Sequence, residues 1–192
     1  MFDATAAVAR EKGFLAMTVE DIAAGAGVSR RTFYENFRDK TDCFLATYDD
    51  AAQTLLARVD AAAAKGRDWE EQVRLALAAT LRVFAAAPDM AYMGVIEVLA
   101  AGPEALERRD AAVRALTRLI ATDEAFAVAD ERPPSLLAEH IAGAISQLIY
   151  GEVLRGRASE LQGLLPQCMY IVLAPMFGPL GATQRAGLSA AA

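Results

Sequence analysis

Cysteine and histidine are scarce in this sequence of 192 residues, which contains two cysteines, Cys43 and Cys168, and one histidine, His140. Two cysteines far apart within helical patterns do not make a disulfide framework. We expect both to be small apolar core residues in a reducing compartment. One histidine cannot build a zinc or di-iron site, because a carboxylate bundle needs Glu-x-x-His pairs from two helices. We therefore predict no metal site and no cofactor.

The sequence also lacks strand patterns, since no run of alternating apolar and polar residues is bounded by turn residues. Hydrophobic residues make up 55% of the chain, but aromatic residues only 7%, and there are seven prolines. Together with many alanines, this composition favours closely packed helices. The apolar segments 95–99 and 171–173 lie inside longer helical patterns. The prediction is an all-α fold.

Features of secreted, membrane-spanning and catalytic proteins are missing too. Met1 is not followed by the apolar segment and cleavage site of a signal peptide, and no run of eighteen uninterrupted apolar residues occurs. No glycine-rich phosphate loop and no set of nucleophile, base and orienting residue is visible. We expect a cytoplasmic protein that does not contact a membrane and is not an enzyme, so no catalytic residue is predicted.

Positive charge is in deficit over the whole chain, which has a net charge of −6 and a pI of about 4.9. This excludes a generic nucleic-acid coat, and any DNA reader of this composition must localise its positive charge. Residues 1–50 contain six Lys or Arg and nine Asp or Glu, a net of −3. Even so, Arg30, Arg31, Arg38 and Lys40 fall within eleven consecutive positions.

Residues 18–40 carry a pattern that packing alone does not explain. Two short helical patterns, at about 18–26 and 29–36, are separated by a Gly-Ala-Gly-Val connector. A connector of this length and glycine content lets two helices cross steeply, as in a helix-turn-helix. Thr18 and Ser29 are good N-cap residues for the two helices.

The second of these helices begins with a cluster of hydrogen-bond donors. Arg30, Arg31 and Thr32 occupy its first turn, where free backbone amides and the helix dipole attract phosphate. With the turn and the caps in place, this cluster indicates DNA contact. The alternative is an ordinary solvated helix face, with Thr18 and Ser29 acting as caps and nothing more.

Proline and glycine signals divide the rest of the chain into further helices. These helices are expected at about 1–12, 39–64, 68–86, 88–101, 103–122, 134–154 and 159–177. The helix 39–64 is about 40 Å long, enough to leave a small module and enter a second body. From Gly178 onward the tail lacks apolar periodicity, and we expect it to be frayed.

These patterns predict three parts of the chain. They are a helix-turn-helix DNA-binding domain at 1–46, a helical ligand-binding and dimerisation domain at 47–180, and a disordered tail at 181–192.

Residues in the first quarter of the chain match a known pattern. They are Gly13-Phe14, Thr18-Val19-Glu20-Asp21-Ile22-Ala23, Ala26-Gly27-Val28-Ser29, Thr32-Phe33-Tyr34, Phe37 and Lys40. With them the chain resembles the tetracycline-repressor-like (TetR) family of bacterial transcription regulators, and the remainder matches only in being helical and of suitable length. The resemblance implies a homodimer whose recognition helices enter successive major grooves of a near-palindromic operator in double-stranded DNA, and an unknown small molecule that releases the DNA.

The resemblance also assigns DNA contacts. Phosphate contact or positioning of the helix is implied for Thr18, Ser29, Thr32, Tyr34, Asn36 and Lys40, and contact with base edges for Arg30, Arg31 and Thr32. An arginine that binds guanine through two hydrogen bonds contributes about 1–3 kcal/mol of discrimination. Tyr34 could instead be a core ring with an exposed edge, and Lys40 could be merely solvated.

Two residues depart from the family pattern. Arg31 stands where glycine or alanine is common, and Glu35 stands where a basic or polar residue is frequent. Phosphate would repel Glu35 unless it accepts from a cytosine amino group or pairs with Arg31 or Arg38, and we favour the pairing. The basic arm that often precedes the first helix is also missing.

Aromatic, methionine and polar residues of the larger domain could line an effector cavity. The predicted pocket residues are Trp69, Phe84, Met90, Tyr92, Met93, Glu97, His140 and Gln147. At helical spacing, such residues are more often plain core. Glu97 lies in an apolar segment, so it must find an internal partner such as an arginine, or face a cavity or water. His140 is expected to be a hydrogen-bonded helix residue.

The helices at about 134–154 and 159–177 have apolar residues on more than one face. One face can pack on the body, and the surplus requires a partner. The small residues Gly143, Ala144 and Gly151 would let a second copy approach closely. We predict a homodimer with a four-helix interface.

The sequence thus predicts a DNA-binding transcriptional regulator, a repressor released from its operator by a small-molecule effector. The alternative is a helical small-molecule-binding or adaptor protein that does not bind DNA specifically. The acidic net charge and Glu35 keep this alternative open.

Overall fold

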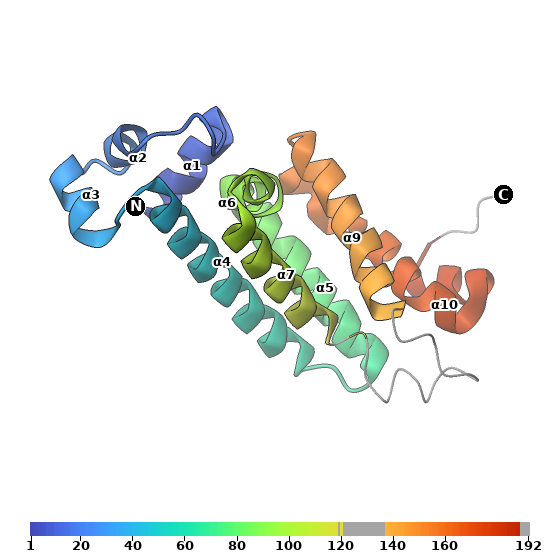
Figure 1. Cartoon of the computed structure of the whole chain (residues 1–192). Helices are drawn as coiled ribbons and strands as arrows, with labels where there is room; N and C mark the ends of the chain where they lie inside the picture. The colour runs from blue at the N-terminus through green and yellow to red at the C-terminus, as the bar shows by residue number, and fades with distance from the viewer. Residues whose placement is uncertain (119, 121–136, 189–192) are drawn as a thin grey trace.

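The computed structural model describes residues 1–118, 120 and 137–188, and within these residues it contains helices and no strand (Figure 1). The prediction of an all-α fold is confirmed. In chain order the elements are α1 (Phe2–Lys12), α2 (Val19–Gly25), α3 (Arg30–Asn36), α4 (Lys40–Ala63), α5 (Trp69–Ala86), α6 (Pro88–Val95), the 3-10 helix η1 (Glu97–Ala100), α7 (Pro103–Thr117), α9 (Leu137–Leu154), the 3-10 helix η2 (Ala158–Leu164) and α10 (Leu165–Ala186). The predicted helix positions 119, 121–122 and 134–136 lie outside the described residues.

Side-chain caps fix the ends of the helix-turn-helix formed by α2 and α3. The Thr18 hydroxyl accepts the backbone N–H of Asp21 at 3.2 Å, and the Asp21 carboxylate accepts the N–H of Thr18 at 3.0 Å. The Ser29 hydroxyl accepts the N–H of Thr32 at 3.0 Å. In the connector Gly27 has a φ of 66°, a conformation that side-chain-bearing residues rarely adopt. Both predicted N-caps are confirmed.

The DNA-binding module, defined as α1 to α3 with the start of α4, does not close its hydrophobic core by itself. Phe33 and Phe44 share a fully buried cluster with Met93 of α6 and Val98 of η1. Helices α1 to α3 have at most eleven residues each, and so small a unit offers too little apolar surface for a complete core. The core of the module therefore extends past residue 46, where the sequence places the domain boundary.

A second core lies between α5, α9, η2 and α10. Leu81, Leu161, Met169 and Leu173 are fully buried in it. Helix α4 runs from the DNA-binding module along α5 (Figure 1). Its 24 residues span about 36 Å. This confirms the prediction that one long helix links the module to the larger body.

The segment predicted as a single helix at 88–101 is broken. Helix α6 ends at Val95, and the chain continues as the tighter η1 after Ile96. The break has a packing cause: Val95 and Ile96 contact the second core, whereas Val98 is buried in the core of the module. A 3-10 turn rotates the side chains onto this different face within three residues. The continuous apolar pattern of 88–101 contains no signal for the change.

The segment predicted as one helix at 159–177 also differs. It begins as η2, and α10 starts with Pro166 in its first turn, where the missing proline N–H is tolerated. The prediction of a frayed tail from Gly178 is wrong for residues 178–186. Gly178 breaks the helix with a φ of 68°, and helical structure continues to Ala186. Ala182 and Ala186 are buried against the second core. This burial explains why residues 178–186 are helical although their apolar periodicity is weak.

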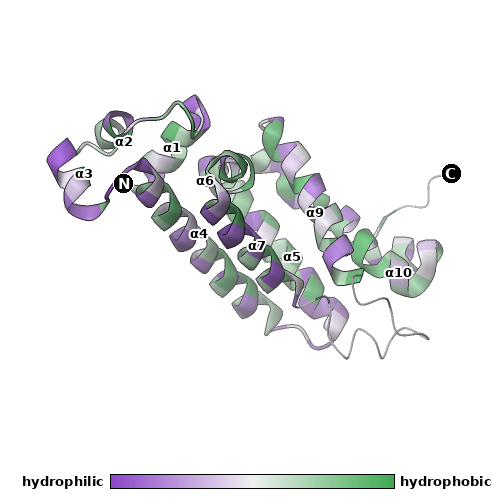
Figure 2. Ribbon diagram, in the orientation of Figure 1, coloured by the Kyte–Doolittle hydropathy of each residue, from purple (hydrophilic) through white to green (hydrophobic). Residues whose placement is uncertain are grey.

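Residues Ala158–Ala186 are long and apolar enough to cross a membrane, judged by length and composition alone, and α10 is largely green in Figure 2. Only 22% of the most apolar window is buried within the chain, so much of its apolar surface remains uncovered. The segment is not one straight helix, because it changes from 3-10 to α-helix at Leu165 and breaks at Gly178.

Shortening the chain tests the corrected end of α10. A chain that stops after Phe177 loses the buried Ala182 and Ala186, and we expect its Tm to fall by roughly 4–10 °C, as a loss of a few kcal/mol does in a domain of this size. A chain that stops after Leu188 keeps every described contact and serves as the control. Thermal denaturation followed by circular dichroism measures both; equal Tm values would show that the last turns of α10 contribute nothing.

Candidate functional site

Helix α3 turns one face to the core and the other to solvent. Phe33 is fully buried, whereas the Arg31 side chain is 90% exposed. Tyr34 packs edge-on against Phe33, with 5.5 Å between ring centroids, and leaves half of its surface exposed. Figure 2 shows α3 as largely hydrophilic. A polar helix face of this kind, next to a helix-turn-helix connector, is the geometry of a recognition helix.

The arginines of α3 are held by neighbouring acids. Arg30 pairs with Glu20 of α2 at 2.5 Å, and the Arg31 Nε donates to Glu35 at 3.1 Å. The prediction that Glu35 pairs with a nearby arginine is confirmed. All four side chains are more than half exposed, so these pairs are weak and a DNA phosphate can replace the acid.

Other predicted DNA-contacting residues make local hydrogen bonds within α2 and α3. The Asn36 side-chain amide donates to the carbonyl of Thr32 at 2.8 Å. The Thr32 and Ser29 hydroxyls lie 3.0 Å apart. The Thr18 hydroxyl donates to Asp21 at 2.9 Å. These bonds are local: they cap α2 and α3 and hold the Asn36 side chain against the backbone of α3.

Lys40 is not a freely solvated side chain. Its Nζ donates to the carbonyls of Phe14, Leu15 and Met17 at 2.9, 3.0 and 3.0 Å and lies 5.0 Å from the centroid of the Phe14 ring. An ammonium has three N–H donors, and all three are used. Lys40 therefore fixes the loop 13–17 between α1 and α2, and a phosphate contact would have to replace one of these bonds.

Glu97 of η1 bonds to the same loop from the opposite domain. Its Oε2 accepts the backbone N–H of Phe14 at 2.6 Å, across 83 positions of sequence. The prediction that Glu97 has an internal partner is confirmed, although the partner is a backbone amide. On the surface Arg10 of α1 also pairs with Asp89 of α6 at 2.6 Å. The loop 13–17 is thus held by Lys40 on one side and Glu97 on the other.

A cavity of about 630 Å³ lies between α4, α5, α6, α7 and α9. Its volume is within the range of roughly 300–1,000 Å³ that is usual for small-molecule sites. Aliphatic residues from every one of these helices line it. Its polar lining residues are Tyr48, Thr80, Arg109, Thr117, Glu139, Ser146, Gln147 and Tyr150.

The structure brings two of the eight predicted pocket residues, Phe84 and Gln147, to this cavity. Met90 and Met93 pack in the core of the DNA-binding module, and Tyr92 packs against the second core. These three residues are on α6, a helix that touches both cores. Helical spacing marks such residues as inward-facing, but it does not tell a filled core from a cavity.

The other three predicted pocket residues lie elsewhere. Trp69 is buried in the second core, at the first turn of α5. Glu97 is occupied by the Phe14 amide. His140 is on an exposed face of α9 and does not line the cavity.

Seven of the eight polar residues that line the cavity were not predicted, among them Tyr48 and Arg109. Tyr48 belongs to the apolar stripe of α4, and the sequence pattern therefore predicts a core residue at this position. Arg109 lies in the segment Glu-Arg-Arg-Asp of α7, which reads as a solvated face. Both line the cavity, and only the packing of α4 against α7 brings them there.

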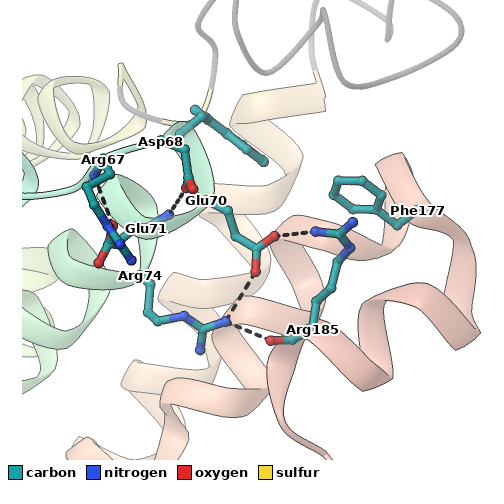
Figure 3. Close-up of a pocket in the computed structure, with 8 residues that line it drawn as sticks. Arg67, Asp68, Glu70, Glu71, Arg74, Phe177 and Arg185 are labelled. Carbon is teal, nitrogen blue, oxygen red and sulfur yellow. Dashed lines mark hydrogen bonds and ion pairs between the residues drawn. The ribbon is translucent and has the colours of Figure 1, made fainter.

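A second pocket of about 440 Å³ lies where the start of α5 meets the end of α10 (Figure 3). Glu70 accepts from Arg74 at 3.4 Å and from Arg185 at 2.8 Å, and Arg74 also donates to the carbonyl of Arg185 at 2.7 Å. The Arg185 guanidinium lies 4.2 Å from the centroid of the Phe177 ring. These groups satisfy one another, so the network attaches the end of α10 to α5.

Comparisons with known proteins agree with this geometry. Residues 2–47 match the sequence model of the bacterial regulatory proteins of the tetR family. The fold matches FadR from Bacillus subtilis, solved in complex with stearoyl-CoA, with a TM-score of 0.76 and 18% identity over 92% of this chain and 96% of that one.

Two further solved structures match as well. FadR from Bacillus halodurans, a fatty acid degradation regulator, has a TM-score of 0.78 and 19% identity over 90% of this chain and 95% of that one. A putative fatty acid metabolism regulator from Clostridium perfringens has a TM-score of 0.72 and 19% identity over 92% and 96%. Among curated protein sequences none matches this chain.

The helix-turn-helix, the long linking helix and the helical body define a class of DNA-binding regulators. Residues 2–47 match the family model of the bacterial regulatory proteins of the tetR family, and the fold of the whole chain is similar to that of solved transcriptional regulators, among them a TetR family regulator. Regulation of transcription through DNA binding is the function that this fold supports.

Replacing Glu97 tests the bond between the two domains. We expect Glu97→Ala to lower the free energy of unfolding by about 1–3 kcal/mol, because the Phe14 amide loses a charged acceptor. Glu97→Gln should lose less, since its amide oxygen can still accept. Urea denaturation measures the stability, and hydrogen exchange reports on the Phe14 amide. Glu107→Ala, an exposed glutamate on α7, is the control; unchanged protection of Phe14 in Glu97→Ala would contradict the assignment.

Proposed function

We propose that the chain is a cytoplasmic repressor that binds a near-palindromic operator as a homodimer and is released by a small-molecule effector in the cavity. The observation that carries the proposal is the position of α6 and η1 between cavity and module. Gly94, Val95 and Leu99 line the cavity, whereas Met93 and Val98 are buried in the core of the DNA-binding module. A molecule in the cavity therefore touches the same short segment that completes the module.

On the DNA side, the exposed face of α3 is the proposed reading surface. The Arg31 side chain is 90% exposed and Tyr34 is half exposed. Arg30 lies beside Tyr34 with 6.0 Å between the guanidinium carbon and the ring centroid. We assign base contacts to Arg30, Arg31 and Thr32, phosphate contacts to Ser29 and Tyr34, and positioning of the helix to Thr18, Asn36 and Lys40.

Dimerisation is proposed through α9 and α10, whose outer surfaces carry small and apolar residues. Gly143 and Ala144 are exposed on α9, and Leu154 at its end is 51% exposed. On α10, Ile171 is only partly covered. A helix pair with this surface gains free energy by packing against its own copy, because apolar area leaves water.

The effector is proposed to have an apolar body. The cavity walls are mainly aliphatic. The similar FadR from Bacillus subtilis was solved with stearoyl-CoA, and two other similar structures are described as regulators of fatty acid degradation or metabolism.

Release follows from a shift of population between two arrangements of the dimer. A dimer can place its two recognition helices in successive major grooves only when they are about 34–36 Å apart. An effector that binds more tightly to a dimer with another separation of the recognition helices shifts the population towards that dimer. The affinity for DNA then falls, at most by the ratio of the effector's affinities for the two arrangements. In this chain the movement would pass from α6 and η1 to α1 and α4, and from these to α3.

Substitution of Arg31 tests the DNA-binding surface. We expect the wild-type chain to bind DNA flanking its own gene with an affinity that falls steeply with salt, as phosphate contacts require. Arg31→Ala should weaken binding by about 1–3 kcal/mol and change the preferred base at one position. Fluorescence polarisation with a set of single-base variants of the site measures both effects.

The control for this experiment is Arg58→Ala, which removes an exposed arginine of α4 outside the module. It should leave affinity and base preference unchanged. Binding that shows no sequence preference for any genomic fragment would contradict the repressor and favour a helical ligand-binding or adaptor protein.

A bulky charge on α9 tests the dimer. Ala144→Arg places a long cation on the proposed interface, so we expect a shift from dimer to monomer at micromolar concentration, measured by size-exclusion chromatography with light scattering. Ala111→Arg makes the same change at an exposed position of α7 and should remain a dimer. A wild-type chain that elutes as a monomer would refute the interface.

A further inference from the structure

The hydroxyl of Tyr48 is one of the polar groups in the wall of the cavity. Tyr48 is 8% exposed and contributes to the core of the DNA-binding module, and its side chain lines the cavity. Within the part of the chain that the structure describes, its hydroxyl makes no hydrogen bond. No buried side-chain oxygen or nitrogen of the described residues lacks a hydrogen-bond partner, so this hydroxyl keeps accessible surface at the cavity wall. It is free to donate to an acceptor on a molecule bound in the cavity.

Arg109 lines the cavity near this hydroxyl. Its one ion pair in the described residues is with the adjacent Asp110, at 3.2 Å, whose side chain is 56% exposed. A guanidinium has five N–H donors and no acceptor, so most of its donors remain available. The cavity is also lined by a carboxylate, Glu139, which belongs to α9, whereas Arg109 and Asp110 belong to α7.

Burial raises the pKa of Tyr48 to about 12, with Arg109 lowering it and Asp110 raising it. The phenol is therefore a neutral hydrogen-bond donor at every physiological pH. A neutral donor beside a permanent cation favours an anionic acceptor. Away from this pair, the walls offer aliphatic residues such as Leu55, Val59, Leu77, Val113 and Leu116, which favour an apolar body.

We propose that Tyr48 and Arg109 form a head-group subsite that binds the carboxylate of an amphipathic acid, whose apolar body fills the rest of the cavity. The proposal rests on the proposed function, since it takes the cavity to be the effector site, and it names the chemistry of the effector. A free carboxylate satisfies both groups at once: one oxygen accepts from the phenol and the other from the guanidinium. A neutral ester or thioester satisfies only the hydrogen bond.

The position of the subsite links the head group to the DNA-binding module. The Tyr48 ring lies against α6, where a Cβ added to Gly94 would be 3.8 Å from Cε2 of Tyr48. Gly94 is three residues from Glu97, whose carboxylate accepts the Phe14 amide of the α1–α2 loop. Tyr48, which would hold the carboxylate, therefore contacts the segment on which the position of that loop depends.

The test uses the full chain without DNA and three probes with the same alkyl chain: decanoate, decanol and decylamine. Isothermal titration calorimetry measures their affinities. We expect decanoate to bind at least about tenfold more tightly than decanol, which corresponds to one charged hydrogen bond, and decylamine to bind most weakly. Equal affinity for decanoate and decanol, or no binding of any probe up to millimolar concentration, would overturn the proposal.

Variants then assign the preference to the two residues. Arg109→Gln should reduce the preference for decanoate over decanol to within about threefold, and Tyr48→Phe should weaken decanoate binding by about three- to tenfold. Arg109→Gln should weaken decanol binding by less than about threefold, and Tyr48→Phe should weaken decanol by less than it weakens decanoate, since the alcohol loses only a neutral hydrogen bond. Arg114→Gln, an exposed arginine on the same helix, should change neither affinity.

A loss of affinity for decanol that equals the loss for decanoate would show a structural role for these residues and refute the subsite. If Arg109→Gln does not fold, Arg109→Lys provides the second variant: it keeps the charge, so decanoate must still be preferred. Because no DNA is present, a negative result here is separate from a failure to bind an operator.

Discussion

The packing of α6 and η1 against α1 is the contact on which the rest of this structure depends. Met93 and Val98 complete a core that three short helices cannot fill, and Glu97 accepts the Phe14 amide in the loop between α1 and α2. The opposite side of the same segment forms a wall of the cavity. Because interiors are close-packed and resist gradual deformation, a displacement of this segment has to be passed on to α1. The DNA-binding module is thus a part of one packed body.

Electrostatics act locally in this acidic chain. Each arginine in the first turn of α3 is paired with an acid, Arg30 with Glu20 and Arg31 with Glu35. These exposed pairs keep the arginines extended along the helix surface at little cost, since such pairs contribute on the order of 0–1 kcal/mol. Binding to DNA would replace the acid beside each arginine by a phosphate. The binding free energy gained per arginine is therefore smaller than for an arginine that has no acidic partner. Selectivity for sequence then depends more on the geometry of α3 than on overall charge.

In the larger body, a few residues at the end of α10 cover the second core and attach α10 to α5. Gly178 takes a positive φ and lets α10 turn back, so that Ala182 and Ala186 cover the second core and Arg185 reaches Glu70 on α5 (Figure 3). Apolar surface of α10, and Leu154 at the end of α9, stay uncovered in the single chain. The body therefore combines an interior cavity with an outer surface suited to a second copy, and α9 contributes to both.

The sequence by itself determined the local features: the N-caps Thr18 and Ser29, the length of α4, and the pairing of Glu35 with Arg31. Each depends on residues within one or two helical turns, where caps, periodicity and i,i+4 contacts act. Only the tertiary structure decided which inward-facing side chains fill a core and which line a cavity, as with Met93 and Tyr48. Helical periodicity gives the buried face of each helix but not what lies opposite it. That depends on how α4, α6 and α7 pack, and this packing joins residues more than forty positions apart.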